Sequence, residues 1–278
     1  MIRLLAIDVD GTLLDSQGRV PDANRDAVAE AAARGIVIVL VTGRAYHFVA
    51  PIARELPCPV TVVASNGALV RDASGRSEHR VALPAAVAAA VLGGTRPWRD
   101  DAGVVFDRDG PAQIVFERTD WSDPRRQAYY QHNRAFIAHV APLEQALVED
   151  PIAVVYNGAV ARMRALRAAL GALEVSREVA VTATEYEARD FALIDVLARG
   201  CDKGTALAAL AERRGVARTD VMAVGDNLND VGMLEFAGWP VVMGNAVPEL
   251  RLRGWPMTAG HDAAGLALAI RTFALGEP

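Results

Sequence analysis

The sequence predicts an α/β fold in which a parallel sheet with flanking helices is interrupted by a second, inserted α/β domain. Three observations support this prediction. Apolar strand-like runs alternate with helical segments at both ends of the chain, which is typical of parallel strands joined by right-handed crossovers. This alternation breaks down in the middle. The length of 278 residues, 52% of them hydrophobic and 23% charged, suits one large domain or two ordinary ones.

The first part of the chain alternates regularly. It predicts strand, helix, strand, helix and strand over residues 3–8, 22–34, 36–44, 46–55 and 59–64. Pro21 and Gly35 mark the start and the end of the first helix, and Pro51 predicts a kink in the second. The run IVIVLV that begins at Ile36 is continuous and β-branched, which favours a strand buried on both faces.

The end of the chain follows the same pattern, whereas the middle does not. Helix, strand, helix, strand and helix are predicted over residues 203–214, 220–225, 229–236, 239–243 and 263–273. The middle mixes helices with alternating strands such as AQIVFER and with turn signals such as Asn157-Gly158. We therefore assign residues 1–83 and 192–278 to one core domain and residues 84–191 to an inserted α/β domain.

Composition and charge exclude several classes of function. A net charge of −5 offers no basic surface for nucleic acid, and no apolar run reaches the roughly 18 residues of a membrane span. We expect no signal peptide, because a strand begins within the first few residues. Cys58 and Cys201 fit no metal-binding spacing and are typical of free thiols in a reducing cytoplasm. The sequence leaves monomer and homodimer open.

The stretch IDVDGT places two carboxylates, Asp8 and Asp10, at the end of a predicted buried strand. Side chains at i and i+2 of a strand point to the same side, so the two should converge. Ligands of open parallel sheets bind beyond the carboxyl ends of the strands. Two carboxylates this close repel each other, and a hard divalent cation such as Mg²⁺ would let both ionise. The alternative is that each aspartate only forms a turn.

Three further segments carry polar side chains at strand ends or helix starts. They are Thr42-Gly43-Arg44, Asp202-Lys203-Gly204 and Gly225-Asp226-Asn227-Leu228-Asn229-Asp230. A hydroxyl, open backbone N–H groups and a cation suit phosphate oxygens. Lys203 is the only lysine beside 28 arginines, which indicates a need for a compact point charge. Each segment alone is also typical of a turn, a helix cap or solvated surface, but their coincidence predicts one site for metal and phosphate.

These segments resemble the motifs of the haloacid dehalogenase superfamily, and in particular its Cof-type phosphatases with a large α/β cap domain. DVDGTLL at 8–14 corresponds to the first motif, VTGR at 41–44 to the second, Asp202-Lys203-Gly204 to the third and GDNLND at 225–230 to the fourth. SNGA at 65–68 is a further Cof-type feature. The resemblance implies a Rossmann-like parallel-sheet core with an inserted cap domain, and it is weaker in the cap.

The resemblance also implies a role for each motif residue. Asp8 would be the nucleophile that becomes an aspartyl phosphate, and Asp10 the general acid and base. Mg²⁺ would be held by the Asp8 carboxylate, the Asp10 backbone carbonyl and Asp226. The remaining positions are phosphate ligands and supporting residues: Thr42, Gly43, Lys203 and Asn229 for the phosphoryl group, and Asp230, Asn66 and Arg44 in support. The implied activity is Mg²⁺-dependent hydrolysis of a small phosphomonoester, such as a sugar phosphate or a phosphorylated cofactor.

Two alternatives share these residues. A phosphotransferase or phosphomutase would use the same aspartyl phosphate with an acceptor sugar in place of water. A non-catalytic sensor of a phosphorylated metabolite would bind without turnover, but it has no need for a nucleophile and an acid together. In the inserted domain, six side chains are candidates for leaving-group contacts: Trp98, Trp121, Arg125, Arg126, Tyr129 and Tyr130. We favour the alternative that the aromatic residues fill that domain's own core and that the arginines face solvent.

Overall fold

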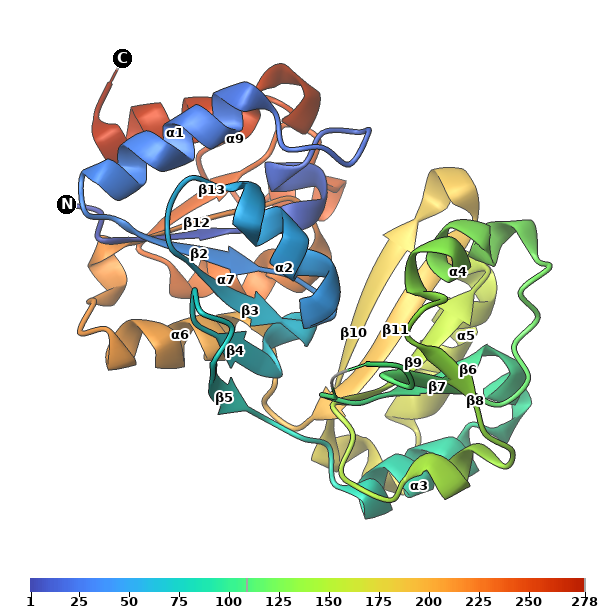
Figure 1. Ribbon diagram of the computed structural model, residues 1–278. Coiled ribbons are helices and arrows are strands. Elements are labelled where there is room, and N and C mark those ends of the chain that lie inside the picture. Colours follow the sequence, from blue (N-terminus) through green and yellow to red (C-terminus); the bar gives the residue numbers. More distant parts are fainter. Residues whose placement is uncertain (109, 278) are drawn as a thin grey trace. The chain divides into compact units, whose positions relative to one another are not determined.

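The chain forms two units in the computed structural model, which describes residues 1–108 and 110–277 (Figure 1). The core unit comprises Met1–Arg80 and the residues from Asp202 onward, and the inserted unit comprises Val81–Cys201. The predicted boundaries at residues 83 and 191 therefore need correction. The second boundary moves to Cys201 because Phe191–Ala198 is a strand that pairs with two strands of the inserted unit.

A seven-stranded sheet lies at the centre of the core unit, in the order β13-β12-β1-β2-β3-β4-β5. The strands are β1 Leu4–Ile7, β2 Val37–Val41, β3 Val60–Ala64, β4 Leu69–Arg71, β5 Ser77–Arg80, β12 Val221–Gly225 and β13 Trp239–Val242. Pairing is parallel from β13 to β3 and antiparallel for β4 and β5. The carboxyl ends of five strands therefore lie along one edge, where the motif residues follow.

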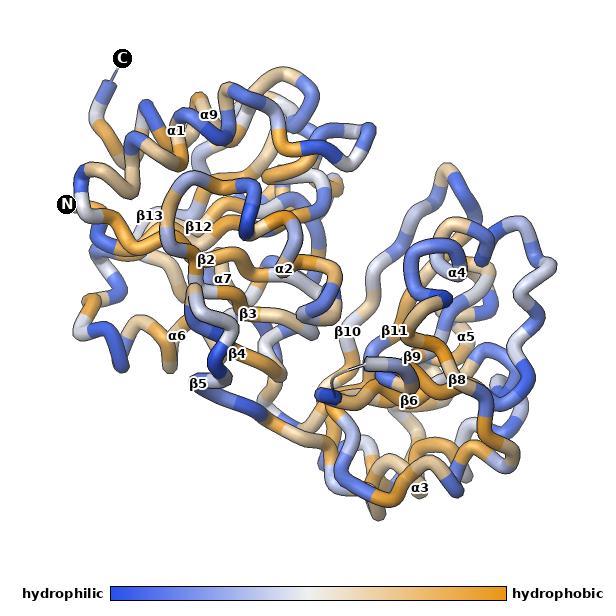
Figure 2. The backbone as a smooth tube through the Cα atoms, viewed as in Figure 1, coloured by the Kyte–Doolittle hydropathy of each residue, from blue (hydrophilic) through white to orange (hydrophobic). Residues whose placement is uncertain are grey.

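Helices cover both faces of this sheet, with α1 and α9 on one side and α6 and α7 on the other (Figure 1). The helices are α1 Asp22–Ala33, α2 Tyr46–Glu55, α6 Lys203–Arg213, α7 Val231–Phe236, α8 Pro248–Arg251 and α9 Gly265–Ala269. Side chains alternate along β1, so Leu4 and Ala6 pack with the apolar residues of α6 and α7. Figure 2 shows that the central strands are hydrophobic along their length, as the β-branched runs predict.

Two predicted helices of the core unit have bounds that differ by two residues or more from the observed ones. The helix predicted from residue 229 begins at Val231, because Leu228–Asp230 forms a tighter turn that Asn227 caps. The helix predicted over residues 263–273 is α9, which continues as wider helical turns over Ile270–Leu275. Neither difference moves a motif residue away from its strand end.

The inserted unit contains a six-stranded, mainly antiparallel sheet in the order β10-β11-β9-β6-β7-β8. Its elements are α3 Ala85–Gly94, β6 Ala102–Val105, β7 Ile114–Phe116, α4 Gln127–Asn133, β8 Ile137–His139, β9 Ala153–Gly158, α5 Val160–Gly171, β10 Val179–Tyr186 and β11 Phe191–Ala198. Its own hydrophobic cluster joins α3 and α5 to the sheet. Within the described residues, no helix is long and apolar enough to cross a membrane.

Several of the six candidate side chains of the inserted unit pack against their own unit. Trp121 stacks on Tyr129 and Tyr130, with ring centroids 6.2 and 5.1 Å away. Arg126 is buried, forms an ion pair with Asp101, and its Nε donates to Asn157 Oδ1 (2.9 Å). The stacked aromatic residues are half-buried within their own unit, as the favoured interpretation expects. Arg126 does not face solvent as expected, because its ion pair with Asp101 lies in the interior of the unit.

Candidate active site

Asp8 lies directly beyond the end of β1, between two parallel neighbours. Its backbone N–H donates to Val224 O of β12 (3.0 Å), and only 4% of the residue is exposed. The prediction that Asp8 and Asp10 converge assumed a strand through both residues. The strand instead ends at Ile7, and the chain turns away with Gly11 at φ +77°. The two carboxylates therefore have different partners.

Lys203 is the partner of Asp8. Its Nζ donates to Asp8 Oδ1 (2.7 Å) and to Asp230 Oδ1 (2.6 Å), and the lysine is 1% exposed. Asp202 caps α6 by accepting from the N–H groups of Gly204 and Thr205 (2.7 and 3.0 Å), which fixes the first turn that carries the lysine. The only lysine of the chain is thus buried between two carboxylates and is not solvated surface.

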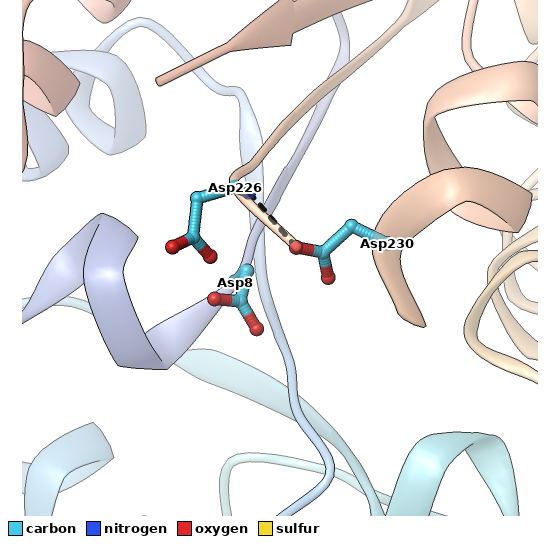
Figure 3. A group of neighbouring side chains, drawn as sticks. All are labelled: Asp8, Asp226 and Asp230. Carbon is cyan, nitrogen blue, oxygen red and sulfur yellow. Dashed lines mark hydrogen bonds between the residues drawn. The ribbon is translucent and has the colours of Figure 1, made fainter. Parts of the chain in front are cut away.

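Asp226 and Asp230 follow β12 and have different environments (Figure 3). Asp230 Oδ2 accepts from the backbone N–H groups of Asp226 and Asn227 (both 2.9 Å), so both of its oxygens are already bonded. Asp226 Oδ1 is buried, and no group in the described part of the chain forms a hydrogen bond with it. Oxygens of Asp8, Asp226 and Asp230 lie within 4.8 Å of one another.

This cluster carries excess negative charge in a buried place. Burial and the charge of Asp230 raise the pKa of Asp8 to about 7, although Lys203 opposes the shift. Burial and the charge of Asp8 raise the pKa of Asp226 to about 9. Burial lowers the pKa of Lys203, but the two carboxylates outweigh it and raise the pKa above its usual value. Three carboxylates face one ammonium, so the unpaired Asp226 oxygen and the charge balance both suit a hard divalent cation.

Asp10 pairs with the cation of the second motif. Arg44 Nε donates to Asp10 Oδ2 (2.8 Å) and Nη2 to Oδ1 (2.6 Å), which is a bidentate ion pair. The Arg44 backbone N–H donates to Thr42 Oγ1 (3.1 Å), and Thr42 is buried at the end of β2. The ion pair therefore connects the turn after β1 to the end of β2.

Asn66 connects the second motif to the fourth. Its backbone N–H donates to Thr42 O (3.0 Å), and its Oδ1 accepts from Asn229 Nδ2 (3.2 Å). A Cβ on Gly43 would lie 3.1 Å from Asn66 Oδ1, so the glycine lets the amide approach. Ser65 and Asn66 have positive φ (50° and 51°), a conformation that is costly for residues other than glycine and is often found at functional sites. All ten sequence-predicted site residues thus lie in the core unit and join in one connected arrangement.

Two residues that touch this arrangement were not predicted. Asn245 Nδ2 donates to Asp226 Oδ2 (3.2 Å) and to the Gly11 carbonyl (2.9 Å). A Cβ on Gly11 would lie 2.3 Å from Asp226 Oδ2, so only glycine leaves room for that carboxylate. A sequence signal for Asn245 exists, because it follows the fifth parallel strand, β13, and the strand-end rule applies there as well.

Known proteins resemble this chain along nearly all of its length. Residues 5–270 match the haloacid dehalogenase-like hydrolases. The HMP-PP phosphatase of Serratia proteamaculans is 31% identical over 251 residues, covering 90% of this chain and 87% of that protein. Phosphatase YwpJ of Bacillus subtilis is 27% identical, covering 96% and 98%. A crystal structure of a haloacid dehalogenase-like hydrolase from Bacteroides thetaiotaomicron has a TM-score of 0.81 at 25% identity, covering 98% and 99%.

The chain belongs to the haloacid dehalogenase-like hydrolases. This confirms the resemblance drawn from the four motifs, and it confirms the predicted α/β fold with a Rossmann-like core and an inserted second domain.

Proposed function

We propose that this protein is a Mg²⁺-dependent phosphatase that hydrolyses a small phosphomonoester through an aspartyl phosphate on Asp8. The observation that carries the proposal is the buried contact of Asp8 with Lys203, beside an Asp226 oxygen that has no partner among the described groups. The names of the curated relatives, HMP-PP phosphatase and phosphatase YwpJ, support the reaction class.

The donor set fits Mg²⁺. Asp8 and Asp226 would hold the ion, together with the Asp10 backbone carbonyl that the family resemblance implies. Asp230 is better suited to orient Lys203 and the turn after β12, because both of its oxygens are already bonded. When bound, Mg²⁺ neutralises charge on the phosphoryl oxygens, which is the main requirement of phosphoryl transfer.

Side chains of the core unit supply the nucleophile, the acid and base, and the groups that bind the phosphoryl oxygens. The Asp8 carboxylate attacks phosphorus. Asp10 must first leave its ion pair with Arg44 and take up a proton; it then gives this proton to the leaving oxygen and later takes one from the attacking water. Lys203 keeps Asp8 in place and adds positive charge beside the equatorial oxygens. The hydroxyl of Thr42, the backbone N–H of Gly43 and the amide of Asn229 would bind the phosphoryl oxygens.

The inserted unit would determine which leaving group the enzyme accepts. Every residue to which we give a chemical role lies in the core unit, so the inserted unit is free to vary with the substrate. A sugar phosphate or a phosphorylated cofactor is the substrate class that we expect.

Release of inorganic phosphate from a panel of small phosphomonoesters tests this proposal. We expect release with Mg²⁺, loss of release with EDTA, and loss in Asp8→Asn, while Asp22→Asn, at an exposed carboxylate on α1, behaves as wild type. Transfer of the phosphoryl group to an added hexose phosphate in preference to water would favour a phosphotransferase. Binding of phosphomonoesters without any release would favour a sensor.

A further inference from the structure

Asn245 joins three segments that meet beside the carboxylate cluster. Its Nδ2 donates to the Gly11 carbonyl (2.9 Å) and to Asp226 Oδ2 (3.2 Å). Its Oδ1 accepts from the backbone N–H of His261 (2.9 Å). The amide is therefore held on both sides, with its N–H groups directed at the turn after β1 and at Asp226.

These contacts determine which oxygen of Asp226 is available. A carboxylate can turn about its last bond and present either oxygen. Here Oδ2 accepts the Asn245 hydrogen bond, which orients the carboxylate plane. Oδ2 lies 2.3 Å from the position that a Cβ on Gly11 would occupy, so the glycine leaves room for this orientation. Oδ1 is the oxygen that remains buried without a hydrogen bond from any described residue. It is also the oxygen that a cation could take without breaking a contact.

We propose that Asn245 is a positioning residue for the metal ion: it binds Asp226 Oδ2 and thereby presents Oδ1 to Mg²⁺. This inference rests on the proposed function, in which Asp8 and Asp226 hold that ion. Hydrogen-bond partners behind a metal ligand typically contribute 10- to 100-fold to metal affinity, because they remove the freedom of the ligand before the ion arrives. The same bond to the Gly11 carbonyl ties the turn after β1 to this carboxylate.

The chain offers a matched control in Asn24. It is fully buried, its Nδ2 donates to the Leu13 carbonyl (2.9 Å), and its Oδ1 accepts from the Ala267 N–H (3.1 Å). Asn24 thus anchors the same turn with the same kinds of bond, but its contacts do not include a carboxylate of the site. Replacing either asparagine with alanine should lower the melting temperature, whereas only Asn245→Ala should weaken metal binding.

Calorimetric titration of the metal-stripped protein with Mg²⁺ measures this difference without catalysis. We expect a Kd about 10- to 100-fold higher for Asn245→Ala, and a wild-type Kd for Asn24→Ala. Asn245→Ser, whose short hydroxyl cannot span both partners, is titrated in parallel and decides the matter if Asn245→Ala does not fold. An unchanged Kd in a folded Asn245 variant, or an equal loss in Asn24→Ala, would overturn the inference. Failure of the wild type to bind Mg²⁺ would instead overturn the proposed function.

Discussion

At the scale of single residues, Lys203 dominates the electrostatics of the site. It is 1% exposed and lies between Asp8 and Asp230. Its positive charge therefore offsets the desolvation cost of burying these two carboxylates in ionised form. Breaking a buried ion pair by removing one partner typically costs about 3–5 kcal/mol, because a charge is left without a counter-ion. A compact ammonium can reach both carboxylates at once, whereas a guanidinium is a wide planar fork.

We therefore expect Lys203→Arg to be harmful although the charge is kept. The free energy of unfolding should fall, and kcat/KM should fall by about 10²-fold or more, because the larger head group displaces Asp8. Steady-state kinetics and thermal unfolding measure both effects. Arg253→Lys, at an exposed ion pair with Glu235, is the control and should match wild type. Wild-type kinetics in Lys203→Arg would show that charge alone suffices.

Some residue roles could be predicted from the sequence and others could not. The single lysine among 28 arginines pointed to Lys203, and the motif spacing pointed to Asp226 and Asp230. The bidentate pair of Arg44 with Asp10 could not be predicted, because it depends on how the chain turns after β1. Side-chain rotamers of this kind are decided by contacts between segments that are distant in sequence.

At the scale of elements, the site depends on close packing between α6 and α7. A Cβ on Gly204 would lie 2.4 Å from the backbone carbonyl of Gly232, so the first turn of α6 can lie against α7 only with glycine here. Gly204 directly follows Lys203, and its N–H donates to the capping Asp202. A shift of this turn would therefore move the lysine.

Gly204→Ala should lower both stability and activity. Overpacking of this kind typically costs about 1–3 kcal/mol, and the shifted helix start should reduce kcat/KM through a misplaced Lys203. Gly93→Ala in α3 is the control, because nothing lies within 4 Å of its added Cβ. That variant should be neutral or slightly stabilised, since alanine favours a helix. Denaturant unfolding and kinetics of the two variants test the difference, and equal behaviour would remove the packing argument.

Element order in the core unit was largely predictable, because β-branched runs and helix-stop residues are local signals. The sheet order of the inserted unit was not. Its central strands β11, β9 and β6 come from distant parts of the chain, and their pairing depends on tertiary contacts. The predicted boundary at residue 191 was wrong for the same reason, since β11 begins at Phe191 and belongs to the inserted sheet.

At the scale of the whole molecule, the buried carboxylates link stability to pH and to metal. In the unfolded chain Asp8 and Asp226 have ordinary carboxyl pKa values of about 4, whereas in the metal-free fold these pKa values rise to about 7 and about 9. Between about pH 4 and about pH 9, the folded state therefore binds more protons at these two groups than the unfolded state does. The contribution of these two groups to the unfolding free energy is therefore full at low pH and is lost as pH rises.

Mg²⁺ should reverse this trend, because it binds the ionised carboxylates. We expect the rise in melting temperature on adding Mg²⁺ to be larger at about pH 8 than at about pH 5.5. Asp226→Asn should show a much smaller Mg²⁺ effect at both values. Melting temperatures measured with EDTA and with Mg²⁺ across this pH range test the expectation. A Mg²⁺-induced rise in melting temperature that does not depend on pH would argue against Asp8 and Asp226 as ligands.

Acid quenching of a single turnover, followed by mass spectrometry of the peptides, shows directly whether Asp8 carries the phosphoryl group. We expect a phosphoryl group on Asp8, formed within the time of one turnover, and none in Asp8→Asn. Phosphate release that continues in Asp8→Asn, or turnover in wild type with the phosphoryl group on another residue, would contradict this expectation.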